Sequence, residues 1–181
     1  MKTRSSLLSI GIFIACLSSA HSADIKDLTI TGKVIANPCV LNVTSVVTLD
    51  IADTSNVYPS SSAGTHAAQS SSPVDINLSS CPVDMRYNAY IAGTADSVDN
   101  NSLAVEQSAD AAQNVAIAFY ENQNGNNTLI PVNTGTTTTQ TVTTDGIGHV
   151  VLLAAVVKAD YTKDVTPGRV TSNATVKINY L

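Results

Sequence analysis

Near its C-terminal end the chain reads Ala174-Thr175-Val176-Lys177-Ile178-Asn179-Tyr180. Small or apolar side chains alternate there with polar ones, and this period of two is typical of a β-strand with one face in a core and one in water. The same alternation recurs upstream, and no stretch has helical periodicity. The upstream groups are Leu28, Ile30 and Val34; Val47, Leu49 and Ile51; Val74, Ile76 and Leu78; and Val115, Ile117 and Phe119.

The segments between these groups are polar and rich in turn-forming residues. Residues 121–127 contain Gly125 and predict a hairpin turn before a strand at 129–132. The apolar run at 150–157 predicts a strand buried on both faces. The loops are expected at 53–72, 96–102, 134–140 and 164–168; within them 136–139 suits an edge strand, and 108–113 is the one segment that suits a helical turn. Seven to nine short strands predict an all-β fold, a single β-sandwich, although pattern alone does not separate a sandwich from a barrel.

The first 22 residues have the order of a secretory signal peptide. Lys2 and Arg4 precede an apolar run at 7–17, and the small-residue segment 18–23 follows it. The run is too short to span a membrane as a helix. Cleavage is expected after Ser22 or Ala23. A lipoprotein signal ending at Cys16 is the alternative, and Phe13 suits it poorly.

Removal of residues 1–22 leaves 159 residues, which suffice for one domain with a core. This part of the chain carries seven basic and fourteen acidic residues, a formal charge of −7. Nucleic acid and anionic membranes are therefore unfavourable partners. The later sequence contains no apolar stretch of membrane-spanning length, so an exported protein with no membrane span in its mature chain is expected.

Two cysteines, Cys39 and Cys81, follow the signal peptide. In an exported protein two cysteines most often form one disulfide. The bridge would close a loop of about 43 residues and contribute roughly 3–4 kcal/mol on the chain-entropy model. A catalytic thiol would leave the second cysteine unpaired in an oxidising compartment, so we predict a structural bridge.

The sequence offers no constellation typical of catalysis or metal binding. His66 and His149 have no metal-ligand spacing to a partner, and surface positions are expected for both. Residues 145–148 contain two glycines but precede a strand, whereas phosphate-cradling loops open helices. We therefore predict no enzyme activity, no catalytic residues, no cofactor and no metal.

The N-terminal alternating segment, residues 24–31, is unusual because it begins almost at the cleavage site. Nothing precedes it as a pairing partner, and a strand with one apolar face is an aggregation hazard at a free terminus unless it has an assigned partner. It is either the first strand of its own sandwich or a strand that pairs with another molecule.

Several fragments, taken in order, resemble the pilins of the chaperone–usher pathway, the type 1 fimbrial subunit family. Gly32 lies seven residues before Cys39, and the strand at 75–81 ends in Cys81. In the tail, Gly168 is fourteenth from the end and Tyr180 is penultimate. The remaining fragments are Tyr90-Ile91-Ala92-Gly93-Thr94-Ala95-Asp96 and Asn114-Val115-Ala116-Ile117-Ala118-Phe119. The resemblance covers essentially the whole mature chain.

The resemblance implies an incomplete immunoglobulin-like β-sandwich that lacks its last strand. Residues 23–31 would be the donor-strand extension and residues 32–181 the pilin domain. The expected partners are other pilin subunits, a periplasmic chaperone and an outer-membrane usher, in a fimbria at the cell surface that supports adhesion. The strand is supplied by donor-strand complementation, a known form of β-strand addition.

The resemblance also assigns residues to this exchange. Leu28 and Ile30 are expected to be the donor side chains. Gly168, Ala174, Val176, Ile178 and Tyr180 are expected to form the accepting and chaperone-binding strand. Lys26 departs from the apolar alternation, and Ile25 would replace it after a one-residue bulge.

Three other interpretations remain at this point. A fibre-tip adhesive subunit would carry a lectin domain for which 159 residues leave no room. A self-contained secreted binding module would pair its N-terminal strand internally and be a stable monomer. An exported hydrolase has no supporting constellation.

Overall fold

The computed structural model describes residues 39–44, 47, 49, 54–62 and 71–181. The chain divides into two units between Val34 and Ile35, and all of these residues belong to the second unit. The predicted signal peptide at 1–22 and donor segment at 23–31 lie outside the described residues. His66 lies outside them as well.

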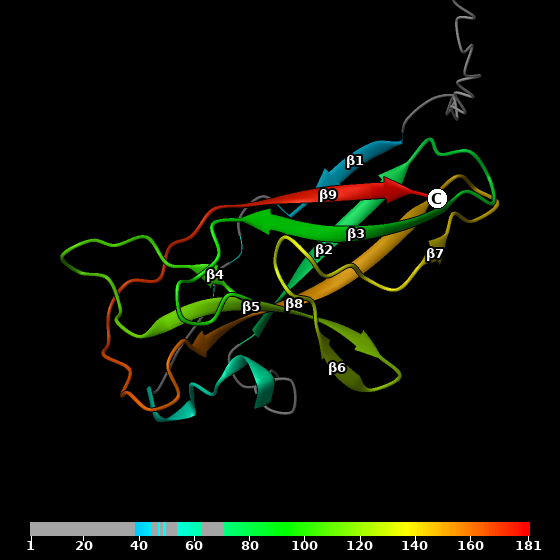
Figure 1. The fold of residues 1–181 in the computed structure, drawn as a ribbon. Coiled ribbons are helices and arrows are strands. Elements are labelled where there is room, and N and C mark those ends of the chain that lie inside the picture. The colour runs from blue at the N-terminus through cyan, green and yellow to red at the C-terminus, as the bar shows by residue number, and fades with distance from the viewer. Residues whose placement is uncertain (1–38, 45–46, 48, 50–53, 63–70) are drawn as a thin grey trace, which may run out of the picture. The chain divides into compact units, whose positions relative to one another are not determined.

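Among the described residues the second unit contains nine strands and one short 3₁₀ helix, and residues 60–62 are α-helical (Figure 1). In chain order they are β1 Val40–Val43, η1 Thr54–Asn56, β2 Ser71–Ser79, β3 Arg86–Gly93, β4 Leu103–Ala104, β5 Val115–Gln123, β6 Asn126–Leu129, β7 Gln140–Thr141, β8 Gly148–Lys158 and β9 Ala174–Tyr180. The described part of the chain holds no helix that is both long and apolar enough to cross a membrane.

The strands form two antiparallel sheets. The larger has the order β1-β2-β8-β5-β4, with β6 paired to β5, and the smaller has the order β7-β3-β9. In the larger sheet Ile76 lies opposite Val150, and in the smaller sheet Ile91 lies opposite Val176. The order is not sequential, because β8 lies between β2 and β5 and β9 lies at an edge beside β3.

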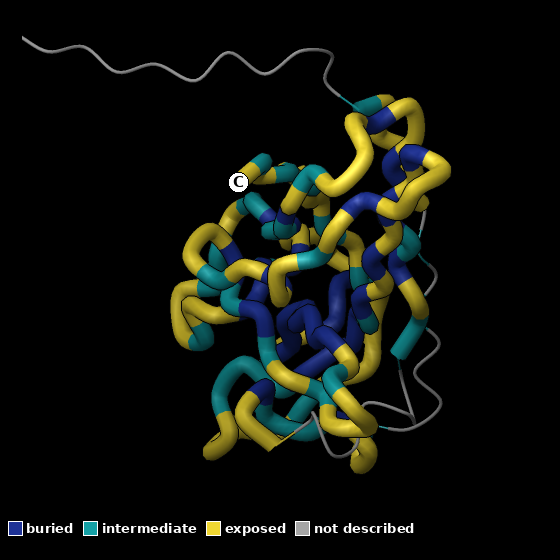
Figure 2. The backbone as a smooth tube through the Cα atoms, turned by 90° about the vertical axis from the view of Figure 1, so that its right-hand side faces the viewer, coloured by how far each residue is buried: buried dark blue, intermediate teal, exposed yellow. Residues whose placement is uncertain are grey.

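The inner faces of the two sheets share one core. Tyr87, Ala89 and Ile91 of β3 belong to the same buried cluster as Ile76 of β2 and Leu152 of β8. Figure 2 shows these buried segments gathered inside the unit, with exposed loops around them. Because each sheet buries only one face against the other, the alternation seen in the sequence follows directly. The predicted β-sandwich is confirmed.

Several predicted elements are confirmed almost residue for residue. β9 covers 174–180, and β2 and β5 contain the alternating groups at 74–78 and 115–119. The predicted hairpin joins β5 to β6 through Asn124 and Gly125, which have φ values of 53° and 86°. Its second strand is β6 at 126–129, so the strand predicted at 129–132 overlaps it at Leu129 alone. Two central residues with positive φ give the turn whose twist matches that of antiparallel strands.

Other expectations differ from the structure. Val47 and Leu49 lie outside any strand, and Ile51 is not among the described residues. Residues 136–139 form no edge strand; instead Thr137 is held by β3, since its backbone N–H donates to the Ala89 carbonyl at 2.8 Å. The helical turn predicted at 108–113 is a single hydrogen-bonded turn, in which the Ala111 N–H donates to the Ser108 carbonyl at 3.1 Å.

The strand β8 is buried on both faces only in its second half. A small second cluster covers the outer face of the larger sheet there, and it contains Ala116, Ala118, Tyr120, Ala155 and Val157. The Tyr120 hydroxyl donates to the Ser60 carbonyl at 2.8 Å, which fastens the segment after η1 over this cluster. Burial raises the pKa of Tyr120. Earlier in β8, His149 and Val151 are exposed.

Candidate binding groove

A groove of about 770 Å³ lies between the edges of the two sheets. Its floor consists of buried apolar side chains from both sheets: Val74, Ile91, Leu103, Ile117, Phe119 and Ala154. One side is lined by Val43, Thr44, Val47 and Leu49, and the other by residues 170–176. The groove therefore runs between the end of β1 and the beginning of β9. Figure 1 shows these two strands in the ribbon.

The core-facing side chains of β9 are only half-buried, although their partners on β3 are buried. Ile178 lies opposite Ala89 and Val176 opposite Ile91. Ala89 and Ile91 are at most 1% exposed, whereas Val176 and Ile178 are intermediate. Because residues paired in this register face the same side of the sheet, the difference arises at the edge beyond β9, where the groove leaves apolar surface accessible.

We call the strands that border the groove its lips, β9 on one side and β1 on the other. The β1 lip shows the same difference in exposure between paired residues. Leu41 of β1 lies opposite Leu78 of β2, so both side chains point toward the core. Leu78 is 1% exposed and Leu41 is 40% exposed. Val43 lies opposite the fully buried Ile76 and is itself half-buried. Both lips thus carry side chains that the core pattern would bury, at positions where one further strand would cover them.

Each lip is also the edge of a sheet. Among the described strands β9 pairs only with β3, and β1 pairs only with β2. The outer edge of each strand therefore presents backbone N–H and C=O groups that no described strand satisfies. Such an edge is a template for another strand.

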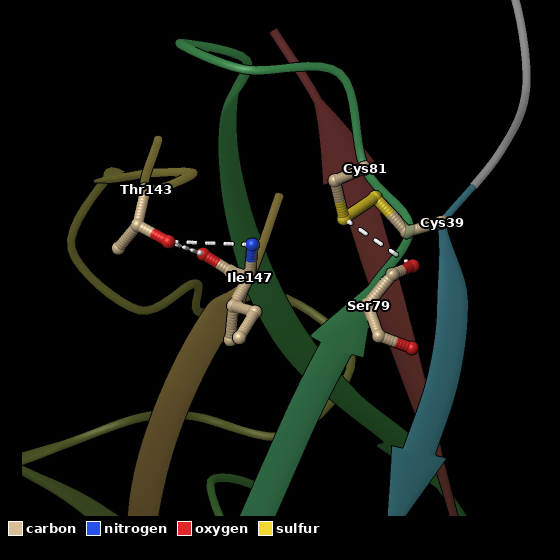
Figure 3. The surroundings of a disulfide bond; sticks show 5 residues. All are labelled: Cys39, Ser79, Cys81, Thr143 and Ile147. Carbon is tan, nitrogen blue, oxygen red and sulfur yellow. Dashed lines mark hydrogen bonds between the residues drawn. A yellow bond between two sulfur atoms is a disulfide. The ribbon is translucent and has the colours of Figure 1, made fainter. Parts of the chain in front are cut away.

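The predicted disulfide is present, and it joins the start of β1 to the end of β2. Cys39 and Cys81 are bonded, with their Cα atoms 4.6 Å apart (Figure 3). Cys81 is also tied to the loop before β8, because its N–H donates to the Gly146 carbonyl at 3.1 Å. The bridge holds the β1 lip against β2 at one end of the molecule.

Gly93 has a steric role at the other end of the groove. It ends β3 opposite Ala174, and a Cβ there would lie 2.6 Å from Leu103 Cδ2 and 3.1 Å from the Asn173 carbonyl oxygen. A side chain at Gly93 would displace Leu103 from the groove floor or move the start of β9. The glycine in the Tyr90–Asp96 fragment therefore sets the shape of the site.

Gly168 lies six residues before β9 and does not line the groove. A Cβ at this position would be 2.3 Å from the Ala112 backbone nitrogen. The neighbouring backbone is bonded on both sides: Ala112 N–H donates to the Arg169 carbonyl at 2.9 Å, and Arg169 N–H donates to the Asp110 carbonyl at 2.7 Å. Gly168 thus permits the close approach that positions the segment leading into β9.

Asn114, which precedes β5, is hydrogen-bonded through its side chain to the loop that follows β8. Its φ is 60°, a left-handed conformation that asparagine tolerates better than most residues. Its side-chain nitrogen donates to the carbonyls of Asp160 and Lys163 at 3.0 and 2.8 Å, and its side-chain oxygen accepts from the Asp160 N–H at 2.8 Å. The asparagine in the fragment at 114–119 therefore holds the loop that follows β8.

The groove has no ionisable side chain among its described lining residues. The described residues also contain no group of three His, Cys, Asp or Glu that could hold a metal ion. His149 is exposed on β8, with Nε2 3.3 Å from Asp75 Oδ1, on a strand face that does not line the groove. The chemistry that this site offers is apolar burial and backbone hydrogen bonding.

Only some of the residues that the sequence assigned to strand exchange line the groove. Ala174 and Val176 line it, while Ile178 and Tyr180 follow on the same lip. Leu28 and Ile30 lie outside the described residues. The floor was not identified from the sequence, because an apolar side chain below a groove has the same local pattern as one below a covered core. The residues 170–173 gave no signal, since they follow a turn and precede the alternation.

Comparison with known proteins places this geometry in a family. A family model described as "Fimbrial protein" matches residues 28–181. Protein FimG of Escherichia coli (strain K12) is 34% identical over 134 residues, which cover 71% of this chain and 72% of FimG. The chain and FimG are therefore related over most of their lengths.

Solved structures share the fold at low sequence identity. The P pilus rod subunit PapA has a TM-score of 0.59 at 15% identity, covering 80% of this chain and 100% of PapA. A subunit of a chaperone–usher pilus has a TM-score of 0.57 at 16% identity, covering 86% of this chain and 95% of its own. The predicted immunoglobulin-like sandwich is confirmed by these neighbours. The chain belongs to the fimbrial protein family and is a structural subunit of a pilus at the cell surface.

Proposed function

We propose that the groove between β1 and β9 receives the N-terminal segment of the neighbouring subunit, residues 23–31 of a second chain, and that the fibre grows by this exchange. The observation that carries the proposal is the paired exposure of Val43 and Val176, which line the groove on opposite sides. Each faces a buried partner, Ile76 or Ile91, yet each is itself only half-buried. One strand inserted between the lips would cover both.

The inserted strand supplies two kinds of interaction. Its backbone groups would pair with the free edges of β1 and β9, which removes the cost of unpaired edges. Leu28 and Ile30 lie two residues apart, so both would point to the apolar floor. Each would contribute about 1.5–3 kcal/mol by burial. Lys26 would interrupt this apolar face, and a bulge that substitutes Ile25 would restore it.

The groove also requires protection before assembly. A subunit with an apolar groove and two free sheet edges would aggregate during export. We assign this protection to a periplasmic chaperone that lends a strand to β9, and the ordered replacement of that strand to an outer-membrane usher. The support is the chaperone–usher resemblance together with the outer edge of β9, which pairs with no described strand. The role is structural, and we assign no catalytic residue, metal or cofactor to it.

Deletion of residues 23–31 tests the proposal. The described lining of the groove comes from other parts of the chain, so the shortened subunit should still co-purify with its chaperone from the periplasm. It should accept the donor strand of another subunit but donate none, and fibres should not extend beyond it. Normal incorporation along the shaft, detected by immunogold labelling of an epitope-tagged variant, would contradict the assignment of residues 23–31.

A further inference from the structure

The end of the molecule that carries the disulfide has an unusual concentration of exposed apolar side chains. Of the eight large hydrophobic residues that are exposed among the described residues, four lie on the segments joined there. Val40 and Leu41 follow Cys39, Val83 follows Cys81 by two residues, and Ile147 follows Gly146. Gly146 accepts the Cys81 N–H at 3.1 Å. Single exposed apolar residues are common, but a group at one end marks an interaction surface.

Leu41 belongs to the groove lip described above, and the other three do not. Val40 points away from the core, opposite Ser79, and is 59% exposed. Val83 is 50% and Ile147 is 49% exposed. Figure 3 shows Ile147 on the loop beside the disulfide. We call Val40, Val83 and Ile147 the disulfide-end patch.

The loop that carries Ile147 is held in a fixed shape. The Ile147 N–H donates to the Thr143 side-chain oxygen at 3.3 Å, and the Ile147 carbonyl accepts from the Thr143 hydroxyl at 3.1 Å (Figure 3). The same carbonyl also accepts from the Thr143 N–H at 2.9 Å. Gly146, with φ 71°, allows the tight return of this loop onto Cys81. A rigid loop that presents an exposed isoleucine is suited to a contact, because little conformational entropy remains to be lost on binding.

Chain connectivity indicates which molecule contacts the disulfide-end patch. Cys39, at the border of the patch, is the residue at which the N-terminal segment joins the described structure. If residues 23–31 occupy the groove of a second subunit, the seven residues 32–38 connect the two bodies and span at most about 25 Å when fully extended. The disulfide end must then lie near the subunit that receives the strand. The patch is thus continuous with the donor-strand connection.

We propose that the disulfide-end patch packs against the rim of the groove of the receiving subunit and fixes the angle between successive subunits of the fibre. This inference rests on the proposed function. The described rim residues Thr44, Thr171 and Ser172 are uncharged, so an apolar surface can approach them without desolvating a charge. The contact joins two different surfaces, as an open head-to-tail filament requires.

The test compares full-chain fibres carrying Val83→Asp and Ile147→Asp with wild-type fibres. The matched control carries Asn124→Asp and Asn126→Asp, which add the same charge at exposed positions of the β5–β6 hairpin. Electron microscopy of single fibres should show a persistence length that falls at least about twofold in the patch variant, because only the linker then orients the subunits. The control should keep the wild-type value. A second variant, Val83→Ser with Ile147→Ser, should show the same loss if the aspartates prevent folding.

A peptide of residues 23–31 distinguishes a failure of the proposed strand exchange from a failure of the proposed patch contact. Added to chains refolding from dissolved fibres, it should stop the growth of wild-type and patch-variant fibres alike. Unchanged stiffness in the patch variants, or loss only of side-by-side fibre association, would overturn the inference alone. Growth of wild-type fibres that ignores the peptide would overturn the proposed function, and the inference with it.

Discussion

Ile178 lies directly opposite Ala89 in the pairing of β9 with β3; both side chains face the core, but only Ala89 is fully buried. The same contrast separates Leu41 from Leu78 across β1 and β2. Two edges with this property border one groove, which indicates that a single strand is lacking from the sandwich among the described residues. The site is a consequence of the fold itself rather than of a set of reactive groups.

Ile178→Asp should weaken capture of a fluorescent peptide of residues 23–31 at least about tenfold, or about 1.4 kcal/mol, because the captured strand would bury a carboxylate beside its apolar side chains. Asn179→Asp is the matched control. It adds the same charge one residue later, where the side chain is exposed on the outer face of β9. Equal affinities of the two variants in an anisotropy titration would show that the β9 lip does not contact the peptide.

Replacement of both Cys39 and Cys81 by serine should lower the free energy of unfolding by roughly 3–4 kcal/mol, because the bridge restricts a loop with a sequence separation of 42 residues. Guanidinium denaturation of the purified chain measures the change. Periplasmic yield should fall in parallel, for Cys39→Ser alone as well. A yield equal to that of the wild type would argue against a structural role of the disulfide.

Gly168→Ala should destabilise the subunit by about 1–3 kcal/mol, because the added methyl group meets the backbone of Ala112 rather than a movable side chain. Gly125→Ala in the β5–β6 turn is the comparison. No atom lies within 4 Å of its added Cβ, so only the positive φ is unfavourable and the loss should stay near 1 kcal/mol. If thermal denaturation ranks the two variants in the reverse order, close approach is not the reason for glycine at 168.

Capture of the 23–31 peptide should be nearly independent of pH between about 5 and 8, because histidine is the side chain that titrates in this range and the described groove lining contains none. Its dependence on salt should also be small, since the lining residues that the structure describes carry no charge. Stopped-flow fluorescence at several pH values measures the rate. A tenfold change in this rate between about pH 5 and 8 would show that an ionisable group contacts the peptide and would contradict the prediction.

The sequence predicted the local elements well. The bounds of β9, the β5–β6 hairpin and the alternating parts of β2 and β5 follow from patterns within a few residues, because strand alternation records which face meets the core. The same reasoning failed at 136–139, where Thr137 bonds to the Ala89 carbonyl and Thr138 bonds to the Glu121 carboxylate in place of a strand ladder. At 108–113 it predicted the single turn but not the backbone bonds that Asp110 and Ala112 make with Arg169.

The roles of single motif residues needed the structure. Asn114 and Gly93 were recognised in the sequence as parts of fragments, but the fragments do not show what those residues touch. Asn114 bonds to residues 46–49 positions away, and Gly93 lies against Asn173 and Leu103. Such contacts depend on how the sheets pack, so they cannot be predicted from the local sequence pattern.

The tail at 174–180 by itself determined that this segment is a strand with one apolar face, because a period of two needs no partner to be recognised. Only the tertiary structure decided that the strand lies at an edge, beside β3 alone and across a groove from β1. The physical reason is that a covered core and an open apolar groove favour the same apolar side chains at alternate positions of a strand. Which of the two they border depends on the order of strands in the sheets.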